Sequence, residues 1–238
     1  MATTLNEFRY EIREIINQYS SDSTIDNRFL DSLISGKRER VLINNFNRFN
    51  KTIPSMYYQT LSCVEVIDVD QSECCDIKTG CYIKRTKEKI PRILSLSDGE
   101  LIDKVGPAVT VSIPFTIIPY RRAEFWSSSR YNKNKIAAFL NNGYMYFIAK
   151  DNIQFKMLER VSIRAVFVNP MEVASFTNCD GTPCFTPDDP FPLEGNMWEY
   201  IKTDILQNDL RIKLSIPRDA EADNADNIID SSKPGGNG

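Results

Sequence analysis

The residues best equipped for chemistry are acids that stand in pairs. Asp68 and Asp70 alternate along a strand-like segment, and Asp188 and Asp189 are adjacent, so either pair offers oxygen ligands suited to Mg²⁺. Neither pair is accompanied by a third acid and a lysine in a nuclease-like pattern. Histidine is absent, which excludes Ser-His-Asp and Cys-His catalysis, and residues 36–44 (GKRERVLIN) do not match a phosphate-binding loop. We therefore expect no enzymatic activity, no metal and no cofactor.

Cysteine is the other residue type that could support chemistry. The cysteines have no regular spacing, and a chain of 238 residues does not need disulfides in order to fold. We expect free thiols at every position: Cys63, Cys74, Cys75, Cys81, Cys179 and Cys184. A zinc site is the alternative, although Cys74 and Cys75 are adjacent, and Cys179 and Cys184 are spaced more widely than in a typical zinc knuckle.

A third candidate is residues 121–147, RRAEFWSSSRYNKNKIAAFLNNGYMYF, which mix basic and aromatic side chains as single-strand nucleic-acid sites do. The alternative is a hairpin, because Asn142-Gly143 favours a tight turn between apolar strands. A polar loop or strand would then precede the hairpin, whose aromatics would supply a core and an outer face. Packing does not explain the basic residues, which are candidates for contacts with phosphates or with acids of a neighbouring copy: Arg121, Arg122, Arg130, Lys133 and Lys135.

Charge is distributed unevenly along the chain, although the net charge is only −3. Residues 78–92, which include the further candidates Lys84 and Arg85, are basic, as are residues 120–135. Residues 186–210 and 217–238 are acidic. These segments are either complementary surfaces that meet between copies of the chain, or a solvated face and a solubilising tail.

Composition places the chain among soluble globular proteins, with 42% apolar and 26% charged residues. No apolar run approaches the roughly 18 residues that would cross a bilayer. Residues 1–20 carry acids where a secretory signal would be apolar. We expect a protein that is made and used in a cytoplasm, without a membrane partner.

Hydrophobic spacing predicts the elements that position these residues. Residues 4–19 have helical periodicity and begin with a capping box, and Asp26 can cap a second helix. On that helix Lys37, Arg38 and Arg40 form a basic cluster, which is either a DNA contact or a solvated face.

From residue 59 the spacing changes to the alternation typical of strands, and we expect six or more strands before residue 177. The resulting prediction is an α+β fold: a small helical bundle of two N-terminal helices and a C-terminal helix, carrying an inserted antiparallel β domain. The expected segments are 1–58 (N-terminal helical part), 59–178 (β domain), 179–194 (Pro/Asp loop), 195–212 (C-terminal helix) and 213–238 (a flexible acidic tail).

Four segments resemble the neck ring proteins of crAss-like and related podovirus-type bacteriophages. They are LNEFRYEIREIINQYSSDSTIDNRFLDSLISGKRERVLINNFNRFN (5–50), CDIKTGCYIKRTKEKIPRIL (75–94), the hairpin region 121–147 and VFVNPMEVASF (166–176). The resemblance implies a structural virion protein, a head-to-tail connector that forms a ring, usually dodecameric, beneath the portal. It also implies contacts with other neck or tail rings, and a channel that passes double-stranded DNA without sequence specificity. It offers no catalytic residues.

By the same resemblance, the C-terminal helix and tail would reach the portal or a neighbouring subunit. The interface candidates are Met197, Trp198, Ile201, Ile205, Leu214 and Ile216. Residence in the virion after assembly in the host cytoplasm follows from this hypothesis. The alternative function is a cytoplasmic nucleic-acid-binding module that uses the basic hairpin region.

Overall fold

The fold is taken from a computed structural model, which describes residues 3–19, 25–49, 53–69, 82–108, 114–150 and 152–210. Two long helices come first, α1 (Leu5–Tyr19) and α2 (Asn27–Phe49). The predicted capping box is present at the start of α1, where Glu7 N donates to Thr4 Oγ1 (3.2 Å) and Thr4 N donates to Glu7 Oε2 (2.8 Å). The side chain of Asp26 accepts from Arg28 N (3.3 Å) at the start of α2, as its sequence position predicted.

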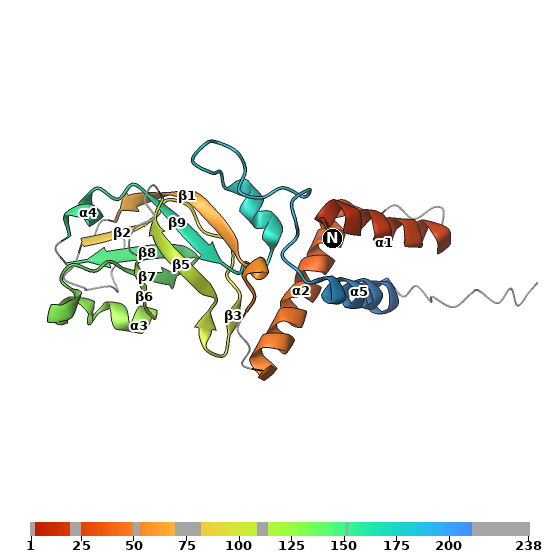
Figure 1. Ribbon diagram of the computed structural model, residues 1–238, viewed down its shortest axis with the longest axis horizontal. Helices are drawn as coiled ribbons and strands as arrows, with labels where there is room; N and C mark the ends of the chain where they lie inside the picture. Colours follow the sequence, from red (N-terminus) through yellow and green to blue (C-terminus); the bar gives the residue numbers. More distant parts are fainter. Residues whose placement is uncertain are drawn as a thin grey trace, which may run out of the picture.

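The C-terminal helix packs against the first two helices, as expected for a small bundle (Figure 1). This helix, α5 (Gly195–Asp204), continues as a π-helical turn, η5 (Ile205–Asp209). Trp198 joins it to α1 through the ring of Phe8, with centroids 4.1 Å apart, and to the preceding loop through Phe191 at 5.0 Å. Lys202 adds an ion pair to Glu11 of α1 (3.1 Å).

A seven-stranded sheet lies between the helical segments, in the order β5-β9-β1-β2-β8-β7-β6. Its strands are β1 (Gln59–Asp68), β2 (Tyr82–Thr86), β5 (Ile102–Pro107), β6 (Thr116–Ile117), β7 (Ala137–Asn141), β8 (Tyr144–Ala149) and β9 (Arg160–Ala165). A separate hairpin pairs β3 (Ser95–Leu96) with β4 (Gly99–Glu100). Short helices lie before, between and after the strands: η1 (Ser55–Tyr57), α3 (Tyr120–Ala123), η2 (Trp126–Ser128), η3 (Arg130–Asn132), α4 (Ile153–Lys156) and η4 (Pro170–Ser175).

The sheet is mixed rather than purely antiparallel, because β6 runs parallel to β7. The first strand in the order is β5 and the last is β6. These two ends come together, since Phe115 N donates to the carbonyl oxygen of Val105 at 2.8 Å. The sheet therefore curls round its own core in the manner of a partly closed barrel.

The predicted hairpin is confirmed in β7 and β8, joined by a two-residue turn. Asn142 and Gly143 have φ angles of 51° and 81°, the left-handed values that such a turn requires. Both faces of the hairpin are covered. Phe147 belongs to the main core, whereas Phe139 and Tyr146 stack in a second, smaller cluster together with Trp126.

The residues before the hairpin form the short helical turns α3, η2 and η3 rather than a polar loop or strand. The reason is the burial of Ala123 and Trp126, which cover the outer face of β7 and β8. The main core runs without a break from the helices into the sheet, since Phe8, Ile34 and Ile163 all belong to it. The division into five segments stays a prediction, and its tail (213–238) lies outside the described residues.

Candidate assembly surfaces

Arg38 was expected in a DNA contact or on a solvated face, and both expectations are wrong, because its side chain is 0% exposed. Its Nη1 donates to the carbonyl oxygens of Phe167 (2.6 Å) and Val168 (3.3 Å), and its Nε donates to that of Pro192 (3.1 Å). The guanidinium also lies 5.9 Å from the centroid of the Phe191 ring. Burial lowers the pKa of Arg38 to about 9. This one side chain thus links α2 to the segment after β9 and to the loop before α5. We call these contacts the Arg38 joint.

The neighbouring Lys37 also forms its ion pairs within the chain. Its Nζ lies 2.6 Å from Asp204 Oδ2 and 2.9 Å from Asp209 Oδ2, which fastens α2 to the end of the C-terminal helix. Burial by itself lowers the pKa of Lys37, but the hydrogen bonds with both acids raise it above its ordinary value overall. The hydrogen bond from Lys37 lowers the pKa of Asp204. Arg40 is exposed, so the predicted basic cluster is split between the interior and the surface.

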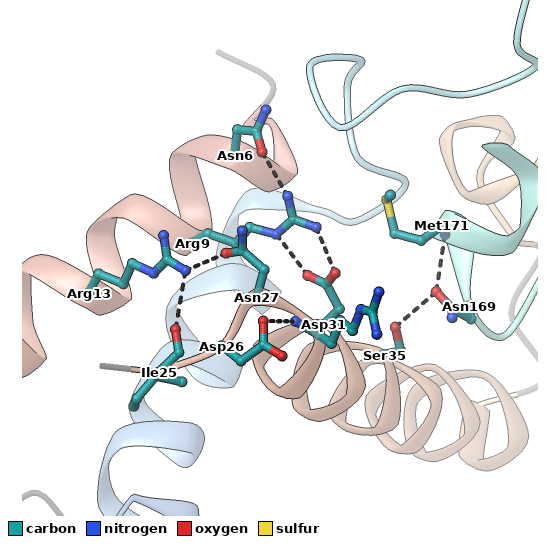
Figure 2. A network of polar contacts seen from close by, with 11 residues as sticks. Asn6, Arg9, Arg13, Ile25, Asp26, Asn27, Asp31, Ser35, Asn169 and Met171 are labelled. Carbon is teal, nitrogen blue, oxygen red and sulfur yellow. Dashed lines mark hydrogen bonds and ion pairs between the residues drawn. The ribbon is translucent and has the colours of Figure 1, made fainter. Parts of the chain in front are cut away.

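Polar contacts between α1 and α2 complete this joint (Figure 2). Arg9 donates two hydrogen bonds to the carboxylate of Asp31, from Nε (2.7 Å) and Nη2 (2.6 Å). Arg13 donates to the carbonyl oxygen of Ile25 (3.2 Å). Farther along α2, the hydroxyl of Ser35 lies 3.2 Å from Asn169 Oδ1, at the start of η4. The helices therefore hold the sheet in one orientation by directed bonds as well as by apolar packing.

The apolar candidates for an interface lie mainly in the chain's own core. Trp198, Ile201 and Ile205 are buried, and Met197 is half-buried, with its sulfur 3.5 Å from the hydroxyl of Tyr57. Packing within the chain accounts for these side chains without a partner. Their assignment to an interface stays a prediction, and the last two candidates lie outside the described residues: Leu214 and Ile216.

The basic candidates fall into two groups. Lys84 is buried, where it donates to the carbonyl oxygens of Lys156 (3.3 Å) and Leu158 (3.2 Å) and pairs with Asp68 (3.2 Å). Arg85 lies 4.4 Å from the centroid of the Tyr144 ring. The others, from the segment before the hairpin, are exposed: Arg121, Arg122, Arg130, Lys133 and Lys135.

Two aromatic rings accompany the exposed group. Phe125, between α3 and η2, is 69% exposed, and Tyr131, next to Arg130 in η3, is 71% exposed. Arg130 lies 4.8 Å from the Tyr131 centroid and donates to the Tyr131 hydroxyl (2.7 Å). We call these five residues the basic–aromatic patch. Sequence composition identified its charges, but the sequence does not show which aromatic rings face solvent.

A second surface was missed from the sequence. Glu7, Tyr10, Glu11 and Glu14 follow the i, i+3, i+4, i+7 spacing of one helix face, all four are exposed, and Tyr10 is 65% exposed. We call them the acidic α1 face. The apolar periodicity of α1 predicted only its buried side. The sequence signal for the exposed face was an aromatic residue, Tyr10, among regularly spaced acids.

The paired acids do not converge on a metal. Asp68 faces Lys84, and its predicted companion Asp70 lies outside the described residues. Asp188 accepts from Asn6 Nδ2 (2.7 Å), whereas Asp189 accepts from the backbone N–H (2.7 Å) and hydroxyl (2.9 Å) of Thr186. Across the described ranges no three His, Cys, Asp or Glu side chains form a metal-binding group.

The expectation of free thiols is wrong for Cys63 and Cys179, which form a disulfide. The bridge joins β1 to the loop after η4, two segments that the fold places side by side. Because the Cys179 sulfur is bonded to Cys63, the zinc alternative for Cys179 and Cys184 is also wrong. Cys184 is a free, half-buried thiol whose pKa is raised by burial. The remaining cysteines lie outside the described residues: Cys74, Cys75 and Cys81.

A cavity of about 710 Å³ opens between the two ends of the sheet and α4. Its apolar walls include Phe115, Ile136 and Leu158, and the charged residues that line it are Lys135, Glu159 and Arg160. Asn134, Asn152 and Gln154 supply further polar groups. Among the described residues, this lining holds one carboxylate, that of Glu159, together with the cations of Lys135 and Arg160.

The helices are joined to a curled sheet, and the outer surface carries charged residues together with exposed aromatic rings. Residues 7–228 match the family model of phage tail ring protein 2, from crAss-like phages. Because the match covers most of the chain, the chain belongs to that family and is a structural ring component of the virion. This confirms the resemblance to ring proteins seen in the sequence. No curated protein sequence matches the chain, and no helix in the described ranges has the length and apolar character needed to span a bilayer.

Proposed function

We propose that this ring protein is a subunit of the head-to-tail connector, docking below the portal and extending the DNA channel toward the tail. The observation that carries the proposal is membership of the tail ring family over residues 7–228. The joint centred on Arg38 supports it, because a subunit that bears load between two parts of a virion needs its helices and sheet held in one orientation. The proposed assembly is a closed ring of about twelve copies, a number suggested by the resemblance to connector proteins.

The proposed role involves no reaction and no cofactor. Its support is the chemistry of the chain, which contains no histidine and whose paired acids are engaged separately where they are described. The work of the protein is then binding: subunit to subunit, ring to portal, and ring to the next neck or tail ring. Assembly in the host cytoplasm is part of the same proposal.

DNA would pass through the ring without being held. Dense basic contacts bind phosphates tightly, so a wall that lets DNA slide should carry few of them. We therefore place the exposed basic residues at contacts between subunits rather than on the channel wall. The engagement of Lys37, Arg38 and Lys84 inside the chain agrees with this assignment, since it removes three cations from any DNA-facing surface.

Native mass spectrometry of the protein, alone and mixed with the portal protein of the same phage, tests the proposal. We expect a closed ring, or a fixed number of subunits bound to the portal. A chain that stays monomeric and ignores the portal would overturn the connector role, although membership of the ring family would stand.

A second function is favoured by one observation, the exposure of Phe125 and Tyr131 in the segment that also exposes Arg121 and Arg122. Exposed rings among cations are the arrangement that binds single strands by stacking and phosphate contacts. A gel-shift titration with short single-stranded DNA tests this alternative. Binding that is lost steeply with rising salt and depends on Phe125 would support it.

A further inference from the structure

The basic–aromatic patch and the acidic α1 face lie at opposite ends of the molecule. In Figure 1, α3 lies at one end of the longest axis, and α1 lies with α5 at the other end, past α2. Neither surface is required by the chain's own packing, since the aromatic rings of both are well over half exposed. The molecule therefore carries two exposed surfaces of opposite charge that lie too far apart to contact each other within one chain.

Both surfaces expose aromatic residues, and the patch adds arginines. Tyrosine, phenylalanine and arginine are enriched where proteins bind each other, and a few such residues supply most of the affinity. The patch offers Phe125, Tyr131 and Arg130, and the acidic face offers Tyr10 between carboxylates. Opposite charges on the two surfaces add attraction and orientation.

The carboxylates of the acidic face are only partly engaged. Glu7 closes the capping box and Glu11 pairs with Lys202. Glu14 has no hydrogen bond or ion pair with any residue that the structure describes. A helix face with a free carboxylate next to an exposed tyrosine is suited to a cationic, aromatic partner.

Features of the patch itself favour a protein partner over a nucleic acid. Arg130 lies over the Tyr131 ring and binds its hydroxyl, so one face of that ring is already covered and is unavailable to a base. The chain also carries a net charge of −3, which opposes general attraction to DNA. The acidic face of a second copy offers carboxylates to the arginines of the patch and does not require stacking on the Tyr131 ring.

We propose that the basic–aromatic patch of one subunit docks on the acidic α1 face of the next subunit in the ring. The contact joins different surfaces of two identical chains, so it repeats from subunit to subunit and closes where the rotation permits. The inference rests on the proposed ring function and names the two surfaces that build the ring. Charge reversal on either surface prevents ring closure, and rising salt weakens assembly.

Two variants test the contact, one for each surface. The patch variant carries Arg121→Glu and Arg122→Glu, and the face variant carries Tyr10→Ser and Glu14→Gln. All four positions are exposed and none takes part in the Arg38 joint, so folding is expected to survive, as circular dichroism would verify. Lys104→Glu reverses a charge on an exposed position of β5 and serves as the control.

Each variant alone retains only one intact surface, so we expect it to form no rings. Its self-association constant should fall by a factor of roughly 10 or more. An equal mixture of the two variants still contains one intact pair of surfaces, the patch of the face variant and the face of the patch variant. Sedimentation and native mass spectrometry should therefore find a dimer of one copy of each variant, and no larger species. The Lys104→Glu control should form rings as the wild type does.

Rings from either variant alone, or no dimer in the mixture while the wild type forms rings, would overturn the inference and leave the ring function intact. A wild type that self-associates only on the portal would overturn it as well, because the proposed contact needs no template. A patch variant that keeps its rings but loses binding to single-stranded DNA would assign the patch to nucleic acid instead. A wild type that neither self-associates nor binds the portal would remove the proposed function together with the inference.

Discussion

The Nη1 atom of Arg38 lies 2.6 Å from the carbonyl oxygen of Phe167, which is 129 residues farther along the chain. This contact links the middle of α2 to the segment that leaves β9. The same guanidinium reaches Pro192, just before α5, so three separate parts of the chain meet on one buried cation. A planar group with several fixed donors suits this task, because it can bond to carbonyl groups that point at it from different directions.

Replacing Arg38 by methionine should lower the free energy of unfolding by roughly 2–4 kcal/mol, because it leaves buried carbonyl oxygens without donors. Arg38→Lys should also destabilise the protein, since a single ammonium cannot reach Phe167 and Pro192 together. Urea denaturation of each variant measures the effect. Arg40→Met is the matched control on the exposed side of α2, and it should change the free energy by no more than about 0.5 kcal/mol.

The ion pairs of Lys37 predict how stability depends on pH. The folded pKa of Asp204 is below its ordinary 3.8, so the stabilisation from its charge is present above that value and is lost as pH falls through the lower, folded pKa. The folded pKa of Lys37 is above its ordinary 10.5, so its contribution is present below that value and is lost as pH rises through the higher, folded pKa. Thermal unfolding from pH 2 to 12 should show both losses.

Asp204→Asn should cost about 1 kcal/mol at pH 7 and should flatten the acid side of the profile. Asp98→Asn, at an exposed turn between β3 and β4, is the control and should leave the profile unchanged. Equal acid sensitivity in the wild type and in Asp204→Asn would show that other carboxylates dominate acid unfolding.

The disulfide predicts a redox-dependent stability. It joins residues 116 positions apart, and a cross-link over so long a loop should stabilise the folded state by roughly 2–4 kcal/mol. A reducing agent should therefore lower the unfolding midpoint of the wild type, whereas Cys63→Ser should have the lower midpoint already and should not respond. Cys184→Ser removes the free thiol and should keep the full response to reduction.

Two glycines should respond in opposite directions to alanine. Gly143 has a φ of 81° in the hairpin turn, so Gly143→Ala should destabilise the protein by about 1 kcal/mol or more. Gly36 lies inside α2, exposed and with open space where a Cβ would lie, so Gly36→Ala should stabilise by about 0.5–1 kcal/mol. Chemical denaturation of both variants measures the pair, and a stabilised Gly143→Ala would contradict the turn geometry.

Local patterns were sufficient for the elements. The capping box of α1, the turn at Asn142 and Gly143 and the apolar stripe that carries Trp198 were all predicted, because each depends on residues within a few positions of one another. Distant pairs were not predictable in this way. The disulfide between Cys63 and Cys179 was missed for that reason, since nothing near either cysteine indicates the other.

For the candidate surfaces, too, the sequence predicted residue types but not their surroundings in the fold. Composition identified Arg121 and Arg122, but it also proposed Lys84 and a solvated or DNA-binding Arg38, which the structure buries. A charged residue is recognised in a sequence by its type, whereas its role depends on which carbonyl and carboxylate oxygens surround it.

The sequence by itself determined the helices α1, α2 and α5, the hairpin, the α+β class and the family of ring proteins. Only the tertiary structure decided that Arg38 joins distant segments, that Cys63 meets Cys179, that Phe125 and Tyr131 are exposed, and that α3 and α1 lie at opposite ends of the molecule. The physical reason is range. Backbone propensity and hydrophobic period act over a few residues, but burial, ion pairing and surface exposure depend on chain segments that come together only when the protein folds.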